Sequence, residues 1–349
     1  MLKNFVRHPY ALVLRAFRKL RTIRTTYRRL VLLPDRFRHL VQRLDALEHA
    51  FEQHQREARL IHFASAPQIP PWDNPTEQFP SAPAVEVITR STFCREKDFI
   101  QPWFRYWTWR IRSGLRYHRK LWEFMFICQA LWERGLLRPG ARGLGFGVGG
   151  EPLPALFAAH GCEILGTDLG SEGAESLGWI GSAQHAAEKE ALRRSAICPD
   201  DLFDQLVSFQ ACDMNHIPPD LTAFDFCWSS CAFEHLGSIE KGLAFVENSV
   251  NCLKPGGWAV HTTEYNLFSN DATVDNAGTV LFRRRDFEAL AARLAEKGHR
   301  MAALSFEPGD GLIDNYIDVA PYCEEPSLRI ALFGFATTSF GIVVQRADP

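Results

Sequence analysis

Five glycines fall within eight residues in GLGFGVGGEP, at residues 143–152 near the middle of the chain. Glycine at this density lets a backbone approach a ligand closely, as nucleotide-binding loops do. The dinucleotide fingerprint G-x-G-x-x-G matches from Gly145 but fails from Gly147, where the sixth residue is Pro152. Glu151 would place a negative charge against a pyrophosphate, and like charges at such range repel. The loop therefore favours a cationic ligand over a phosphate-bearing cofactor.

Acidic residues end the next two strand-like runs. Asp168 closes CEILGTD, where a carboxylate can accept hydrogen bonds from both hydroxyls of a ribose. Asp213 lies in FQACDMN, where it can accept the amino group of an adenine or, equally, cap a turn or a helix. An acid in the position of Asp168 serves any adenosine ligand, so these residues leave NAD and S-adenosylmethionine open.

The stretch FDFCWSSCAFEHL is the most specific element of the chain. Its strand ends at Ser229 and Ser230 and opens on Glu234 and His235. A helix follows and leads to LKPGG, a Pro-Gly turn, and then to a further strand in WAVHTTE. This order places polar side chains at the end of a strand, where ligands of parallel sheets bind.

In chain order, GLGFGVGGE, GTDL, ACDMN, FDFCWSSCAFEHL and LKPGGWAVHTTE resemble the motifs of class I S-adenosylmethionine-dependent methyltransferases. The resemblance covers roughly residues 115–345 and is greatest to bacterial members associated with synthesis of polysaccharides and other glycoconjugates. It implies S-adenosylmethionine as the cofactor. It also implies an α/β fold, with a Rossmann-like, seven-stranded, mostly parallel sheet and helices on both faces. The last strand of that fold runs antiparallel, and TTSFGIVVQR suits it.

The resemblance implies roles for the residues that match its motifs. Those expected to bind the cofactor are Gly147, Gly149 and Glu151 at the methionine moiety, Asp168 at the ribose, Asp213 and Met214 at the adenine, and Ser229 and Ser230 at the methionine end. Arg119, in the helix before the glycine loop, is a further candidate for the cofactor carboxylate, because a guanidinium fork suits that group.

Two positions depart from the family pattern. Gly145 stands where the family has an acid, which removes one interaction expected to brace the loop. Glu151 stands where the family has its third glycine, and we expect it to reshape the methionine end of the pocket. Neither departure affects the expected ribose and adenine contacts.

The acceptor's activation needs a base, because a sugar hydroxyl is a poor nucleophile until its proton is removed. The candidates are His235 and Glu264, with His261 behind them. A histidine is suited by its ordinary pKa of about 6.5, although His235 has a purely structural alternative. Glu264 and Asp271 could instead hold a divalent metal. Two acids in one loop are weak evidence for that, so we assign no metal ligands.

Three further segments are candidates for the acceptor pocket. Residues 282–298 predict a helix whose basic start, at residues 283–285, meets either an acidic group or only solvent. The segment 307–326 is long for a plain connection and could form a lid. Tyr265 and Asn266 follow the fifth strand and could bind polar groups of a substrate.

Alternating strands and helices must position these residues. Strand-like runs fall at 142–147, 162–168, 207–212, 224–230, 257–263 and 301–306. Helical patterns separate most of them, which predicts a mostly parallel sheet covered on both faces. The closing RIALFGFATTSFGIVVQR predicts two strands joined by a turn.

The chain divides into three predicted regions: a basic helical extension (1–60), a Pro-rich linker with an aromatic strap (61–114) and the methyltransferase domain (115–349). Residues 1–33 are basic and amphipathic, which suits peripheral contact with an anionic membrane or a helix exposed to solvent. Apolar residues at heptad spacing over 30–52 predict a short coiled coil and a homo-oligomer. The alternative is one amphipathic helix packed on its own domain.

Composition narrows the class of protein. A net charge of -2 over 349 residues excludes nucleic-acid binding through bulk charge. Nine cysteines without a CxxC pair indicate buried thiols in a reducing cytoplasm rather than a disulfide framework or a zinc site. No apolar run reaches transmembrane length, and we expect no secretory signal. We expect a cytoplasmic protein, with the inner face of the membrane as a second location.

The leading hypothesis is therefore a methyltransferase that acts on a sugar hydroxyl in a glycan or glycoconjugate precursor, a small-molecule or glycan substrate. A nicotinamide-dependent sugar oxidoreductase on a similar sheet is the first alternative, and Glu151 and LKPGG argue against it. The second is a non-catalytic scaffold of a membrane-associated biosynthetic complex, assembled through residues 1–60.

Overall fold

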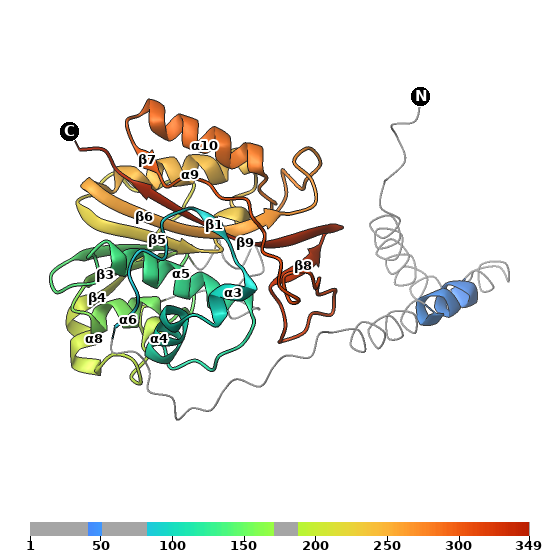
Figure 1. Ribbon diagram of the computed structural model, residues 1–349, viewed down its shortest axis with the longest axis horizontal. Coiled ribbons are helices and arrows are strands. Elements are labelled where there is room, and N and C mark those ends of the chain that lie inside the picture. The colour runs from blue at the N-terminus through green and yellow to red at the C-terminus, as the bar shows by residue number, and fades with distance from the viewer. Residues whose placement is uncertain (1–40, 51–81, 171–187, 349) are drawn as a thin grey trace, which may run out of the picture.

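The computed structural model describes residues 41–50, 82–170 and 188–348. Within these residues a nine-stranded sheet forms the centre of the molecule (Figure 1). Its strands are β1 (Thr92–Phe93), β2 (Arg142–Phe146), β3 (Glu163–Asp168), β4 (Val207–Ala211), β5 (Phe224–Ser230), β6 (Leu253–Asn266), β7 (Arg300–Met301), β8 (Arg329–Leu332) and β9 (Phe335–Gln345). They lie in the order β1-β9-β6-β5-β2-β3-β4, and β7 and β8 also pair with β9.

Five neighbouring strands, β4-β3-β2-β5-β6, run parallel, and β9 runs antiparallel to β6. The carboxyl ends of parallel strands meet at one edge of a sheet, and ligands bind beyond that edge. The loop after β2, the end of β3 at Asp168 and the end of β5 at Ser230 therefore converge.

Helices cover both faces of the sheet. They are α3 (Glu96–Phe99), α4 (Pro102–Arg110), α5 (Arg119–Glu133), α6 (Leu153–Ala159), α8 (Asp200–Leu206), α9 (Ile239–Asn251) and α10 (Arg284–Glu296), with short 3-10 turns η2 (Lys189–Leu192) and η3 (Phe233–His235). In Figure 1, α9 and α10 lie on one side of the sheet and α4, α5, α6 and α8 on the other.

Strand β5 shows how the sequence fills both layers. Side chains of a strand alternate between its faces, so Phe226 and Trp228 pack with the α4, α5 and α6 side. Cys227, between them, packs with the α9 and α10 side. All three are fully buried, as expected of a central strand in a parallel sheet covered on both faces.

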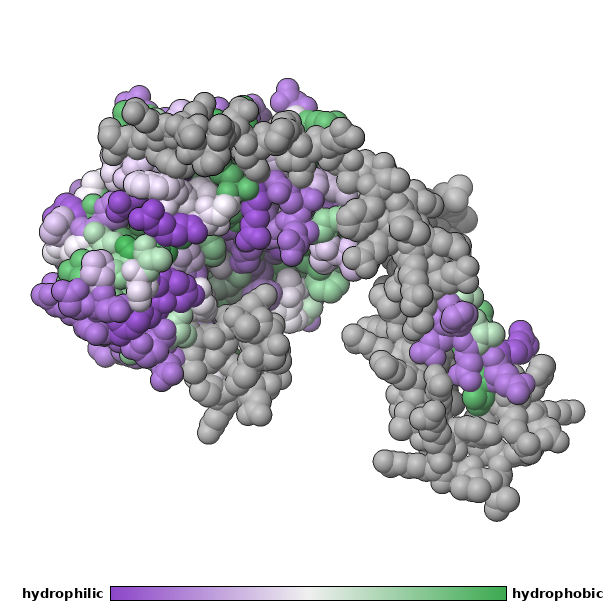
Figure 2. All heavy atoms as spheres, turned by 90° about the horizontal axis from the view of Figure 1, so that it is seen from below, coloured by the Kyte–Doolittle hydropathy of each residue, from purple (hydrophilic) through white to green (hydrophobic). Residues whose placement is uncertain are grey.

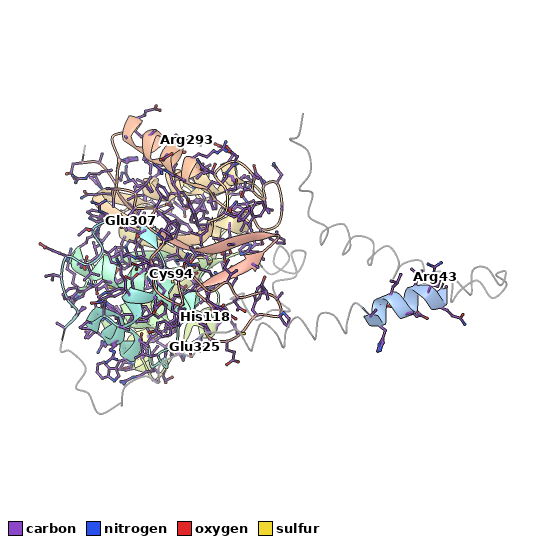
Figure 3. The ribbon with its side chains drawn as sticks, turned by 45° about the vertical axis from the view of Figure 1, so that its right-hand side comes forward. Arg43, Cys94, His118, Arg293, Glu307 and Glu325 are labelled. Atoms are coloured by element: carbon purple, nitrogen blue, oxygen red, sulfur yellow. The ribbon has the colours of Figure 1, made fainter. Side chains whose placement is uncertain are left out.

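The start of α5 is fixed by its capping residue. His118 Nδ1 accepts a hydrogen bond from Lys120 N at 3.1 Å, which satisfies a donor that has no partner within the helix. Figure 3 labels His118 at this end of the helix. The cap places Arg119 and Lys120 on the first turn and Glu123 directly after it, next to the end of β5.

The fold class predicted from the sequence is confirmed, with two corrections. The sheet has nine strands rather than seven, because β1 and β8, of two and four residues, add to β9. The strand predicted at 301–306 is wrong, because only Arg300–Met301 pairs with β9. The terminal hairpin is confirmed as β8 and β9.

The LKPGG segment is part of a strand rather than a separate turn. Strand β6 begins at Leu253, and its register with β5 shifts between Phe224 and Phe226. Gly256, with φ of 74°, lies in the irregular stretch. Only a residue without a side chain adopts such a φ without strain, so the Pro-Gly pair makes a bulge at the start of β6.

The aromatic residues of the strap are buried against α5. Trp103, Phe104 and Trp107 of α4 belong to the core shared with α5, and Trp107 Nε1 donates to Gln129 Oε1 at 2.7 Å. The expected boundary at residue 115 thus separates elements that pack together.

The N-terminal predictions fall mostly outside the described residues. Residues 1–33 lie outside them entirely. Of the heptad seam over 30–52, residues 41–50 are helical and Leu47 is 57% exposed. None of the helices in the described part combines the length and the apolar character that a bilayer crossing requires. On the face seen in Figure 2, hydrophobic residues form small separate patches among hydrophilic ones.

Candidate active site

A cavity of about 360 Å³ opens at the carboxyl edge of the parallel strands. Its size falls within the range of small-molecule sites. The residues that line it come from α5, the glycine loop, β3 and the end of β5: Lys120, Phe124, Gly147, Val148, Gly149, Gly150, Glu151, Pro152, Asp168, Ser230, Cys231, Ala232 and His235. Two of the predicted glycines, Asp168, Glu151, Ser230 and His235 therefore share one space.

The glycine loop needs glycine at two positions. Gly147 and Gly149 have φ of 58° and 47°, in the left-handed region. A Cβ on Gly147 would also lie 2.8 Å from the Cβ of Ala232, closer than real contacts allow. The loop can thus bring its backbone against a ligand, a cradle that any side chain at Gly147 would fill.

Asp168 joins the end of β3 to the glycine loop. Its Oδ2 accepts from Gly149 N at 3.0 Å, and its Oδ1 accepts from Leu169 N at 2.8 Å. The carboxylate is buried and lines the cavity. Both oxygens are therefore held in place by backbone donors before any ligand binds.

Trp228 explains both departures from the family pattern. Its Nε1 donates to Glu151 Oε1 at 2.6 Å. A Cβ on Gly145 would lie 2.5 Å from Cζ2 of the same indole, so the ring excludes a side chain where the family has an acid. The acid of this chain lies at Glu151 instead, where it accepts from the N–H of the same indole.

Glu151 is a neutral acid near pH 7 rather than an anion. Burial raises the pKa of Glu151 to about 8, although the bond from Trp228 opposes that shift. The repulsion argument against a pyrophosphate assumed a charged carboxylate, and it is weaker than the sequence indicated. A cationic ligand remains compatible, because it would favour loss of the proton.

Asp213 and Met214 occupy different surroundings. Asp213 Oδ1 accepts from Asn215 N at 2.8 Å, and Oδ2 contacts His216 Nδ1 at 2.8 Å. These contacts are those of a turn aspartate, the alternative that the sequence left open. Met214 is buried, with its Sδ 3.3 Å from where a Cβ on Gly147 would lie. Met214 thus packs next to the glycine loop at Gly147.

The paired serines at the end of β5 have separate partners. Ser229 Oγ bonds to His261 Nδ1 at 2.8 Å, and Ser249 Oγ bonds to the other ring nitrogen at 3.0 Å. Burial lowers the pKa of His261 to about 3, so the ring is neutral. Ser230 Oγ instead donates to Glu123 Oε2 at 3.1 Å and lines the cavity. Ser229 and His261 are core residues, and Ser230 belongs to the site.

Residues 144–261 match the family model described as a methyltransferase domain. The match runs from β2 into β6 and spans the glycine loop, Asp168 and the β5 end that line the cavity. Residues 144–261 therefore form a methyltransferase domain. Its cofactor is S-adenosylmethionine. The cavity, the glycine loop and the buried Asp168 carboxylate fit an adenosine ligand with a cationic end.

Solved structures similar to the methyltransferase share little sequence with it. A sarcosine dimethylglycine methyltransferase from Galdieria sulphuraria is 14% identical, with a TM-score of 0.44, over 71% of this chain and 99% of that one. An S-adenosylmethionine-dependent methyltransferase from Mesorhizobium loti is 18% identical, with a TM-score of 0.36, over 62% and 98%. Magnesium protoporphyrin IX methyltransferase from Synechocystis PCC 6803 is 13% identical, with a TM-score of 0.38, over 72% and 100%. None of the curated proteins matches the chain.

Arg119, expected at the cofactor carboxylate, is not among the residues that line the cavity. It pairs with Glu264 and, at 3.5 Å, with Glu123. Lys120, the next residue, lines the cavity, and its Nζ lies 3.1 Å from Glu123 Oε2. The sequence analysis singled out Arg119 and assigned no role to Lys120 or Glu123. The available signal was a carboxylate within the apolar run of α5, because a buried acid needs partners.

The two candidate bases differ in exposure. His235 lines the cavity, and its Nδ1 lies 3.1 Å from Gly278 O and 3.1 Å from Thr279 Oγ1. Glu264 is buried beside Arg119, and its Oε2 has no hydrogen-bond partner. Burial raises the pKa of Glu264, and Arg119 opposes this.

The sequence's alternative metal pair does not form. Asp271 has 97% of its side chain exposed and pairs with Arg285, whereas Glu264 is buried. The basic start of α10 is likewise engaged with acids of its own surroundings, since Arg283 pairs with Asp286 at 2.9 Å. The solvated-helix alternative therefore describes this segment.

The remaining acceptor-pocket candidates have structural contacts. Tyr265 is buried against Phe93 and stacks on Phe340. Asn266 Nδ2 donates to Ala272 O at 2.9 Å. The 307–326 segment is attached to α3 through Asp314, whose Oδ1 accepts from the backbone N–H of residue 96 at 2.9 Å. These contacts hold the three features in the fold.

Proposed function

We propose that this methyltransferase transfers a methyl group to a sugar hydroxyl of a glycan or glycoconjugate precursor. The resemblance to glycan-associated members of the family supplies the sugar. One observation supports a hydroxyl: two buried carboxylate oxygens, Glu234 Oε1 and Glu264 Oε2, have no hydrogen-bond partner. They lie beside Cys231 and His235 of the cavity wall. Oxygens of this kind accept hydrogen bonds from hydroxyl groups.

We assign the general base to His235. A carbonyl oxygen only accepts, so the 3.1 Å contact with Gly278 O places the ring proton on Nδ1. The lone pair is then on Nε2, which takes the acceptor's proton as its oxygen attacks. Glu234 Oε1 lies 3.9 Å from Nε2 and would stabilise the imidazolium that forms. Glu264 remains the second candidate for this role.

S-adenosylmethionine supplies an activated methyl group on its sulfonium. We propose that Gly147 and Gly149 approach the methionine moiety, that Asp168 accepts the ribose hydroxyls, and that Ser230 and Glu151 border the methionine end. Asp213, Met214, Ser229 and Arg119 keep their expected cofactor roles only as predictions. Lys120 is the better candidate than Arg119 for the cofactor carboxylate, because it lines the cavity.

The test is transfer of a labelled methyl group to two acceptor panels. One panel holds sugars and nucleotide sugars, and the other holds amines of similar size. We expect the labelled methyl group to appear on sugar hydroxyls. Transfer to amines alone would contradict the proposal, and calorimetric binding of S-adenosylmethionine would still report an intact enzyme.

We also propose that the N-terminal region locates the enzyme. Residues 1–33 would contact anionic lipid at the cytoplasmic face, and residues 30–52 would associate as a coiled coil. The basic composition and the exposure of Leu47 on the helix over 41–50 support this. Sedimentation with anionic and neutral vesicles, and the molar mass of the full chain against a variant lacking residues 1–60, test the two parts separately.

A further inference from the structure

Three potential metal ligands meet behind the cavity wall. Cys231, Glu234 and Glu264 each offer one donor atom, and these atoms lie within 4.8 Å of one another. All three residues are buried. They come from the end of β5, from η3 and from β6, so only the folded chain brings them together. Cys231 also lines the cofactor cavity, which places the group on its acceptor side.

Each carboxylate presents one held oxygen and one unpartnered oxygen. Glu234 Oε2 accepts from Thr263 Oγ1 at 2.9 Å, and Glu264 Oε1 is held by Arg119. The other oxygens, Glu234 Oε1 and Glu264 Oε2, are buried without a hydrogen-bond partner. Leaving such an atom unsatisfied is costly, so both positions need a cation or a proton. Outer partners that fix one oxygen and leave the other to a metal are the usual arrangement around metal ligands.

The cysteine is held in an unusual backbone conformation. Cys231 has φ of 51°, which residues other than glycine rarely adopt. Its N–H donates to Thr262 O at 3.0 Å and contacts Thr262 Oγ1 at 3.2 Å, which fixes it there. Its Sγ makes only loose contacts, at 3.7 Å from Arg119 and 3.8 Å from Glu264 Oε1. Strain of this kind persists where the surroundings impose it, and it gathers at functional sites.

The charges around the group leave a negative excess. The carboxylates are Glu123, Glu234 and Glu264, and the cations paired with them are Arg119 and Lys120. His235 faces the group from η3. Burial raises the pKa of Cys231, so the thiol is neutral in the absence of a metal. One further positive charge would balance the set.

We propose that Cys231, Glu234 and Glu264 bind one divalent transition metal of the zinc type. Binding breaks the S–H bond, forms a metal–sulfur bond and releases the proton to solvent. A thiolate favours zinc over magnesium or calcium. Three protein ligands with a fourth position open are the pattern of catalytic rather than structural zinc. The open position faces the cavity, where the metal would bind the acceptor's oxygen and lower its pKa.

The inference does not depend on the acceptor being a sugar. Cobalt(II) serves as the probe, because its bond to a thiolate gives a sulfur-to-cobalt absorption band. Titration of the full chain is expected to give this band at one equivalent and to lose it on addition of zinc. X-ray absorption of the zinc form should show one sulfur at about 2.3 Å.

Variants assign the band to these residues. Cys231→Ser should abolish the band. Glu234→Gln and Glu264→Gln should each weaken cobalt binding by more than about 100-fold, which is a larger loss than removal of an outer partner causes. Thr263→Val removes such an outer partner and should weaken binding by about tenfold. Cys227→Ser and Glu247→Gln are matched buried controls on the opposite face and should bind as the unaltered chain does. A band that survives Cys231→Ser, or an unaltered chain without stoichiometric binding, would overturn the proposal.

Discussion

The polar groups on the two sides of the cavity, in its wall and directly behind it, are satisfied differently. On the cofactor side, both oxygens of Asp168 accept backbone N–H groups, from Gly149 and Leu169. On the acceptor side, Glu234 and Glu264 each keep one buried oxygen without a partner. The cofactor side is therefore complete before a ligand arrives, whereas the acceptor side awaits a hydroxyl, a proton or a metal. We expect damage to the first half to appear in cofactor affinity and damage to the second in turnover.

The largest effect is expected on the acceptor side. His235→Asn keeps a side chain of similar shape that can occupy the contacts of Nδ1, but it removes the base. Methyl transfer to a hydroxyl should fall by about 10²–10⁴-fold, the usual contribution of a general base. Steady-state kinetics should show the loss in kcat, with the Kd of S-adenosylmethionine nearly unchanged. An equal loss in cofactor affinity would show instead that His235 supports the pocket.

On the cofactor side, Asp168→Ala should weaken S-adenosylmethionine binding by roughly 100-fold. A bond to a charged group contributes about 1.5–3 kcal/mol, and the change also releases Gly149 N from its acceptor. Calorimetric titration measures the effect, with the exposed Asp201→Ala as control. Unaltered affinity in a folded variant would remove Asp168 from the cofactor site.

A smaller change to the same half tests the shape of the loop. Gly147→Ala introduces a Cβ 2.8 Å from Ala232 at a φ of 58°. We expect a loss of about 1–3 kcal/mol in the free energy of unfolding, together with weaker cofactor binding. Gly114→Ala meets nothing within 4 Å and should cost less. Urea unfolding compares the two, and equal stability would mean that the loop relaxes freely.

The smallest effect concerns the pH dependence set by Glu151. Its pKa is about 8 in the folded chain against an ordinary 4.5. The folded state therefore binds this proton more tightly, and the resulting stability is full below pH 4.5 and is lost as pH rises through about 8. Glu151→Gln should flatten that part of the stability profile, measured by urea unfolding at several pH values.

Cofactor binding should show the opposite trend for the same residue. A deprotonated Glu151 attracts a cationic ligand, so affinity should rise a few-fold as pH passes about 8. Glu151→Gln should remove the rise. A rise that persists in the variant would point to another titrating group.

The cofactor half was largely predictable because its determinants are local in the sequence. Gly147 and Gly149 adopt left-handed backbone angles that glycine tolerates far better than other residues, and Asp168 ends a strand beside them. The strand at 301–306 failed because an alternating pattern there packs against β9 for only two residues. Periodicity records which residues are apolar but not how many find a partner strand.

The acceptor half could not be predicted from local sequence, because its contacts join distant segments. Arg119 and Lys120 are adjacent cations, and only the rotation of α5 decides that Lys120 reaches the cavity while Arg119 pairs with Glu264. The same applies to Glu151, because burial raises its pKa and its hydrogen-bond partner is an indole 77 residues away in the chain.

The sequence by itself determined the α/β class, the glycine loop, the acid at the end of β3 and the family to which these belong. Each follows from backbone geometry and strand order, which short motifs encode. The tertiary structure alone decided that Trp228 takes the space beside Gly145, that Glu151 carries a proton, and that Cys231, Glu234 and Glu264 meet. Those features depend on burial and on contacts between distant segments, and burial fixes charge only once the chain has folded.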